Sequence, residues 1–250
     1  MKTQNYASPI FTAASFAVIS FAFFVVTGCS ADSSIAGATD EPVVTAEAVN
    51  MGAPSKAVAS DDGIHGTMTD PRDGQVYKVV KIGEQWWMAE NLNYEAEGSA
   101  CYSLRSGECE TRGRYYDWQT AMDIKGKTSQ PTYPVRGVCP ADWHLPTAEE
   151  WRTLIHVVGQ SESSYALKAN YGWAPGFEGA DKFGFTALPE GEIHSGDVWL
   201  HGVDARFWAS SEDEDEFGQT AAIYDDMAEV RMELILKSRM VQLTVRCVHD

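Results

Sequence analysis

The sequence predicts an α+β domain that is rich in loops, and three observations lead to this prediction. Apolar side chains recur at helical spacing over residues 148–158, which indicates a helix. Runs rich in Val, Ile, Tyr and Trp within residues 75–88 and 205–248 are typical of strands. Residues 161–203 are rich in Gly, Trp and Phe without a clean period, which indicates a long, packed region of loops.

The first 28 residues are expected to be a signal peptide. Lys2 precedes an apolar run at residues 10–26, and the run ends in the letters VTGC at residues 26–29. Small residues before a cysteine resemble the processing site of bacterial lipoproteins, which implies cleavage before Cys29 and diacylglycerol on its sulfur. A plain transmembrane anchor is the alternative, because a run of this length nearly spans a bilayer. Either way the body of the protein lies outside the cytoplasm, and a lipid would anchor it at the outer membrane or cell surface.

The chain is strongly acidic, with a formal net charge of −17 at pH 7. Residues 1–28 contain one lysine and no acid, so their removal changes the charge to −18. A protein of this charge is a poor partner for nucleic acid or for anionic lipid head groups. The charge otherwise indicates a solubilising surface.

Composition divides the mature chain into a tether and a domain. Residues 29–62 consist largely of Ala, Ser, Thr, Val, Gly, Pro and acids without aromatic residues, which predicts a flexible tether. All eight Trp and nine of the ten Tyr follow residue 63. Residues 63–250 are long enough for one domain with a substantial core.

The first half of this domain reads as a hairpin followed by irregular chain. A turn at residues 70–74 leads into a predicted strand at residues 75–82, and Gly83-Glu84 suits a two-residue turn into a return strand at residues 85–88. The letters YYDWQTAM at residues 115–122 predict a short helix. A loop rich in Gly, Thr, Ser and Pro follows at residues 126–134.

The second half is organised around the predicted helix at residues 148–158. Thr147 and Glu150 form a capping box at its start, and Gly159 is suited to end it. Strands are expected in four later segments, at residues 205–210, 220–224, 229–236 and 241–248.

Four cysteines remain once Cys29 is assigned to lipid, and three pairings of them exist. We favour Cys101 with Cys109, because the eight-residue spacing contains Ser-Gly and closes a short loop, and therefore Cys139 with Cys247. The rival is a zinc site, but the sequence contains no CxxC pair.

Five blocks in order resemble one family. They are DPRDGQVYKVVKIGEQWWMAENLNY, GRYYDWQTAM, GVCPADWHLPTAEEW, FWASSE and VRCV. Together they are similar to the Fibrobacter succinogenes major paralogous domain, over residues 66–249. The family has no assigned reaction. The HLPTAEEW block also resembles formylglycine-generating enzymes and C-type-lectin-like domains, which implies a compact fold of short helices and small antiparallel sheets. That resemblance also implies a long disulfide from the first helix region to the last strand.

Catalytic motifs do not occur in this sequence. It has no GxSxG elbow, HExxH helix, phosphate loop or dinucleotide fingerprint. Formylglycine-type oxidation requires a reactive cysteine pair, whereas the four cysteines here are better explained as structural. With 36 acids in the chain, a pair of carboxylates carries no information about glycoside hydrolysis.

An acidic stretch after the predicted strand at residues 205–210 offers oxygen ligands for calcium. The candidate ligands are Glu212, Asp213, Asp215, Asp225 and Asp226. The EPN, QPD and WND motifs of calcium-dependent sugar binding are absent, however. A solvated charged loop is the alternative. No other cofactor is expected.

Exposed aromatic rings are the remaining candidates for ligand contacts, because sugars stack on aromatic faces. Trp173 and Trp199 lie in or beside the loop region and are the predicted ligand-binding residues, while Trp151 and Trp208 are expected in the core. We therefore expect a non-catalytic surface lipoprotein with a module for binding or adhesion to polysaccharide. The alternatives are an envelope structural protein without a small ligand and an enzyme of the formylglycine-generating type.

Overall fold

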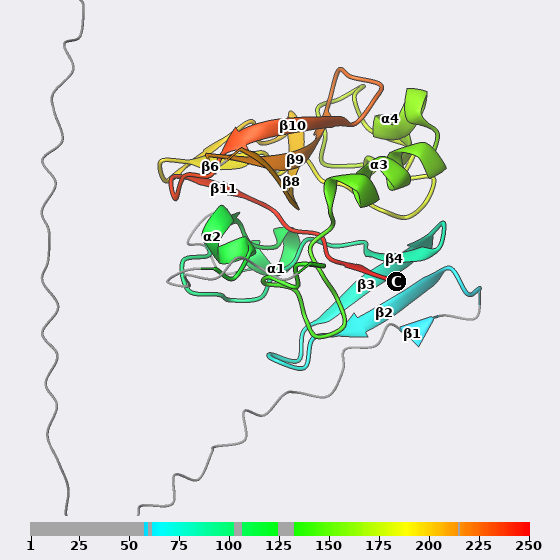
Figure 1. Ribbon diagram of the computed structural model, residues 1–250. Coiled ribbons are helices and arrows are strands. Elements are labelled where there is room, and N and C mark those ends of the chain that lie inside the picture. Colours follow the sequence, from blue (N-terminus) through cyan, green and yellow to red (C-terminus); the bar gives the residue numbers. More distant parts are fainter. Residues whose placement is uncertain (1–57, 60–61, 103–106, 125–132, 215) are drawn as a thin grey trace, which may run out of the picture. The chain divides into compact units, whose positions relative to one another are not determined.

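The computed structural model describes residues 58–59, 62–102, 107–124, 133–214 and 216–250 (Figure 1). The predicted signal peptide, Cys29 and nearly all of the predicted tether lie outside the described residues. All described residues belong to the second of two compact units, residues 49–250. Within this described part, no helix is both long enough and apolar enough to cross a membrane.

The N-terminal half of the domain contributes most of an antiparallel sheet whose last strand comes from the C-terminus. Its strand order is β1-β2-β3-β4-β12. The strands are β1 (Val58–Ala59), β2 (His65–Thr69), β3 (Val76–Ile82), β4 (Gln85–Met88) and β12 (Val248–His249). Ile82 lies opposite Gln85, which confirms the predicted two-residue turn, and Gly83 adopts the positive φ of 64° that this turn requires.

Two further sheets complete the β structure. The three-stranded sheet has the order β10-β9-β8, from β8 (Asp204–Glu214), β9 (Phe217–Tyr224) and β10 (Arg231–Leu236). The four-stranded sheet has the order β5-β11-β6-β7, from β5 (Tyr116–Asp117), β11 (Val241–Leu243), β6 (Glu192–His194) and β7 (Asp197–Trp199). Short helices and small antiparallel sheets confirm the predicted α+β class.

Helix α3 (Ala148–Val157) is the longest helix among the described residues, and it begins as its sequence predicts. The Thr147 side chain accepts from the Glu150 amide, and the Glu150 carboxylate accepts in return from the Thr147 amide. The remaining helices are α1 (Glu108–Arg112), α2 (Trp118–Ala121), the 3-10 turn η1 (Gln160–Glu162) and α4 (Ser163–Leu167).

Several predicted elements are shorter than expected. The helix predicted at residues 115–122 is only α2, because the Asp117 side chain accepts from the Thr120 amide and starts the helix there, while Tyr116 pairs with Leu243 in a sheet. The strand predicted at residues 241–248 is divided into β11 and β12. The predicted loop at residues 126–134 lies almost wholly outside the described residues.

The break between β11 and β12 coincides with Arg246, which is 1% exposed. Its guanidinium donates to three backbone carbonyls and one amide oxygen at 2.7–3.0 Å, and these acceptors belong to Met88, Phe185, Thr186 and Asn91. Burial lowers the pKa of Arg246 to about 9. Arg246 thus joins the last segment of the chain to the chain at residues 88–91 and 185–186, which no sequence pattern places together.

Two apolar cores lie on opposite faces of the three-stranded sheet. Neighbouring residues Phe207 and Trp208 on β8 point to opposite faces, so each enters a different core. In the first core Trp87 lies 4.9 Å from Trp151 between ring centroids, and in the second Trp208 lies 5.2 Å from Trp118. Figure 1 shows α3 and α4 beside this sheet, and the C-terminal segment in red running from β11 toward β4.

Both disulfides of the favoured pairing are present. Cys101 is bonded to Cys109, and Cys139 is bonded to Cys247. The first disulfide joins Cys101, which precedes α1, to Cys109 within that helix. The second joins the approach to α3 to the segment just before β12.

Candidate functional site

A groove of about 1110 Å³ lies between helix α1 and the four-stranded sheet, and it is the candidate binding site. This volume slightly exceeds the range of roughly 300 to 1,000 Å³ that is typical of small-molecule sites. Tyr102 and Glu110 line one side of the groove, and Ile193 of β6 and Gln242 of β11 line the other side. We call this feature the α1 groove.

Local sequence explains why α1 forms this wall. Gly107 adopts a φ of 89° at the start of the helix, and the Cys101–Cys109 disulfide closes the loop behind it. At the base, Ala100 and Tyr115 form an antiparallel bridge with hydrogen bonds of 2.9 Å in both directions. The disulfide therefore links α1 covalently to the segment before it, and the Ala100–Tyr115 bridge joins that segment to the chain just before β5.

An ion pair attaches the far side of α1 to the body of the domain. Arg112 donates to both carboxylate oxygens of Glu190 at 3.1 Å and to Glu108 at 2.8 Å. Glu190 is 2% exposed, and burial raises its pKa although Arg112 opposes this. Burial together with Arg112 lowers the pKa of His201. These groups hold α1 in place, and a smaller hollow of about 220 Å³ lies beside them next to Tyr171.

The charges that line the α1 groove cancel. Among the described residues, its charged lining residues are Glu95, Glu110, Arg114 and Arg239, two of each sign, in a chain whose net charge is −17. Arg114 pairs with Glu95 at 3.2 Å, and Arg239 donates to the Gln119 amide at 3.1 Å. The groove is thus a nearly neutral, polar surface on an acidic protein.

Two polar atoms of the groove residues have no hydrogen-bond partner within the described part of the chain. They are Nε of Arg114, which is a donor, and Oε1 of Gln242, which is an acceptor. Both are buried, so a small side-chain movement would be needed to present them to a ligand. A hydroxyl group both donates and accepts, and it matches such a pair.

Tyr102 supplies an aromatic ring at this groove. Its centroid lies 4.6 Å from that of His201, and the Arg112 guanidinium carbon lies 4.8 Å above its ring. These contacts fix the ring in position. The sequence prediction missed Tyr102, although its place beside the cysteine of a short disulfide loop was a signal that could have identified it.

The two predicted ligand-binding tryptophans do not share a surface. Trp199 is 57% exposed, but it pairs with Glu192, and both point away from the face on which Ile193 borders the groove. The prediction of an exposed Trp173 is wrong. It is 5% exposed in the first core, its indole N–H donates to the Ala187 carbonyl at 3.0 Å, and so its faces are not available to a ligand.

The structure also separates the predicted calcium ligands. Asp225 and Asp226 follow β9 at one end, whereas Glu212 lies opposite Gly218 at the other end. Eight residues of strand span about 26 Å, so these groups are too far apart to bind one ion. The prediction that they form a single calcium site is therefore wrong. Asp215 lies outside the described residues, as do the side chains of Glu212 and Asp213.

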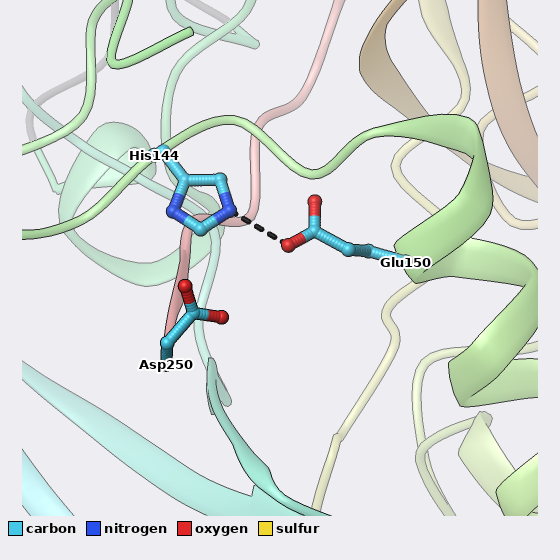
Figure 2. A group of neighbouring side chains, drawn as sticks. All are labelled: His144, Glu150 and Asp250. Carbon is cyan, nitrogen blue, oxygen red and sulfur yellow. Dashed lines mark hydrogen bonds and ion pairs between the residues drawn. The ribbon is translucent and has the colours of Figure 1, made fainter. Parts of the chain in front are cut away.

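A different group of potential ligands is formed where α3 begins. His144, Glu150 and Asp250 each place one ligand atom within 4.8 Å of the others, and Figure 2 shows their side chains converging. Nε2 of His144 lies 2.8 Å from Oε1 of Glu150. Burial would raise the pKa of Glu150, but hydrogen bonds from His144, Thr147 and Gln85 outweigh it and lower the pKa to about 2. His144 and Asp250 lie far apart in the sequence, so no local pattern predicts that they come together.

Residues 80–249 match the family described as Fibrobacter succinogenes major domain. The match covers more than half of the chain and includes α1, both disulfides and the α1 groove. No curated protein and no solved structure matches.

Proposed function

This chain belongs to the Fibrobacter succinogenes major domain family, and from the geometry of its α1 groove we propose that it is a non-catalytic module that binds neutral polysaccharide. The observation that carries the proposal is the cancellation of charge in a groove of about 1110 Å³. A chain of charge −17 repels acidic polymers, whereas an uncharged sugar chain meets no such barrier.

The chemistry of the wall also favours sugar. Tyr102 offers an aromatic ring held by His201 and Arg112, and sugars bind to such rings with polar groups around them. Arg114 and Gln242 contribute a donor and an acceptor that suit hydroxyl groups. The Cys101–Cys109 disulfide and the Arg112–Glu190 ion pair hold helix α1, which reduces the entropy that binding costs.

The cysteines support a binding role over a formylglycine-generating reaction. That reaction would require a free, reactive cysteine pair, and Cys101, Cys109, Cys139 and Cys247 are all engaged in disulfides. The letters VTGC at residues 26–29 support export and a lipid on Cys29, so the module would be displayed at the outer membrane or cell surface.

Pull-down of the soluble mature domain on insoluble cellulose and hemicellulose, together with a panel of glycans, tests the proposal. We expect binding to at least one neutral polysaccharide, with roughly tenfold weaker affinity for Tyr102→Ala and for Gln242→Ala. Trp199→Ala is the matched control, since it removes an exposed ring on the other face of the same sheet.

Each outcome has a distinct meaning. Loss of binding in Trp199→Ala with full binding in Tyr102→Ala would show that polysaccharide binds at the face of β7 that bears Trp199, and not in the α1 groove. Failure of every carbohydrate, with and without calcium, would refute the proposal. The alternative would then be an envelope structural protein without a small ligand.

A further inference from the structure

The start of α3 and the end of the chain carry a second group of polar side chains, separate from the α1 groove. His144 precedes α3, Glu150 lies in its first turn and Asp250 follows β12. In Figure 2 the Glu150 carboxylate lies beside Nε2 of the His144 ring, and the Asp250 carboxylate lies below the ring. One imidazole nitrogen and two carboxylate oxygens lie within 4.8 Å of one another.

This donor set is chemically specific. Imidazole nitrogen with carboxylate oxygens suits Zn²⁺ and similar transition metals, whereas Ca²⁺ takes oxygen ligands. Ligand atoms bound to one Zn²⁺ lie roughly 3.4 Å from each other, given bond lengths of about 2.1 Å in a tetrahedron. The three ligand atoms here lie within 4.8 Å of one another, so small side-chain movements bring them into coordination distance.

Two of the three ligands are already held in orientation. The His144 backbone forms an antiparallel bridge with Val248, and its side chain is 9% exposed. The Oε2 atom of Glu150 accepts from the amide and hydroxyl of Thr147 at 2.7 and 2.9 Å, which leaves Oε1 directed toward His144. Asp250 is exposed, so an ion can enter from solvent.

An amide group occupies the position between the carboxylates. Nε2 of Gln85 donates to Oε1 of Glu150 at 2.9 Å and to Oδ1 of Asp250 at 2.8 Å. The NH₂ group of Gln85 carries partial positive charge, and it lies between two carboxylates that would also attract a cation. Displacement of one neutral amide would therefore give an ion access to both oxygens.

We propose that His144, Glu150 and Asp250 form a binding site for a divalent transition metal ion, with Zn²⁺ as its probe. The ion would join the segment after β12 to the first turn of α3. This site is independent of polysaccharide binding, because none of its three ligands lines the α1 groove.

Titration calorimetry with Zn²⁺ on the metal-free mature protein, without a purification tag, tests this assignment at pH 7. We expect one saturable site, an increase in melting temperature on Zn²⁺ addition, and no binding of Ca²⁺ at the same concentration. Asp250→Asn and His144→Asn should each weaken Zn²⁺ binding at least tenfold. His194→Asn is the matched control, because it removes a histidine that is 52% exposed and lies elsewhere.

Absence of saturable Zn²⁺ binding by the wild-type protein would overturn the proposal. So would unchanged affinity in Asp250→Asn, whose exposed position makes misfolding an insufficient explanation. If His144→Asn unfolds, the Asp250→Asn result decides alone. Binding of Ca²⁺ in preference to Zn²⁺ would also contradict the assignment, since imidazole is not a ligand for calcium.

Discussion

Cys139 and Cys247 are covalently joined across 108 residues of sequence, and both are fully buried in the second core. Close to this disulfide, His144 and Val248 exchange backbone hydrogen bonds of 3.0 and 2.9 Å. The approach to α3 and the last strand are thus joined twice within a few residues. This connection closes a loop that contains α3, α4 and the entire three-stranded sheet.

Removal of this disulfide should therefore cost more stability than removal of the other one. We expect Cys139→Ser with Cys247→Ser to lower the free energy of unfolding by about 4 to 5 kcal/mol, since a long closed loop restricts the unfolded chain most. The matched pair, Cys101→Ser with Cys109→Ser, should lose about 2 to 3 kcal/mol. Urea denaturation measures both, and equal losses would contradict the loop-closure account.

Replacement of the buried arginine should be strongly destabilising. Arg246→Met removes the donors to three buried acceptors and one partly buried acceptor, and unpaired buried acceptors cost about 1 to 3 kcal/mol each. We expect a loss of at least about 3 kcal/mol in the free energy of unfolding. Arg239→Met is the control, because Arg239 is exposed and should change stability by only about 0.5 kcal/mol. Similar losses in the two variants would show that the Arg246 hydrogen bonds contribute little.

Asp204 should make stability depend on pH. It is fully buried, and burial raises its pKa to about 6 although Arg206 opposes this at 2.9 Å. The pKa in the unfolded chain is about 3.9, so the folded state binds the proton more tightly. The contribution of Asp204 to the free energy of unfolding therefore falls as pH rises from about 4 to about 6, and changes little above that.

The Asp204→Asn variant isolates this effect. The difference in unfolding free energy between wild type and variant should fall by roughly 2 kcal/mol between pH 4 and pH 7. Urea denaturation at several pH values measures it. A difference that stays constant with pH, or rises, would show that the Asp204 carboxyl is not protonated preferentially in the folded state.

Gly137 should not tolerate a side chain. A Cβ atom there would lie 2.2 Å from the Ala121 carbonyl oxygen and 2.4 Å from Leu145, and the backbone φ is 56°. Gly137→Ala should therefore lower the free energy of unfolding by at least about 2 kcal/mol, through backbone strain and overpacking together. Gly196→Ala is the control, since its φ is 91° but nothing lies within 4 Å, and it should cost about 1 kcal/mol. Thermal denaturation compares the two.

Some features of this fold could be predicted from the sequence because each of them depends only on residues that are neighbours in the chain. The capping box needs only Thr147 and Glu150, and the first hairpin needs only Gly83 between two strands. The cysteine pairing followed from counting and spacing. The break between β11 and β12 was not predicted, because Arg246 finds its acceptors up to 158 residues away and no local pattern indicates them.

The candidate site was harder to predict, because exposure depends on packing. Trp173 and Trp199 both follow glycine-rich or polar chain, yet one is 5% and the other 57% exposed. The acidic residues appeared close in sequence, but β9 separates them by its full length. Tyr102 and Gln242 line one groove because Ala100 bridges Tyr115 and the next strand, β5, pairs with β11.

The low burial of helix α1 affects how this module can change in evolution. Its loop is closed by its own disulfide, and apart from Cys109 none of its residues is buried. Substitutions along the groove wall should therefore alter ligand preference without a matching loss of stability. A lineage could multiply this domain and vary its specificity there, while inheriting the same two cores unchanged.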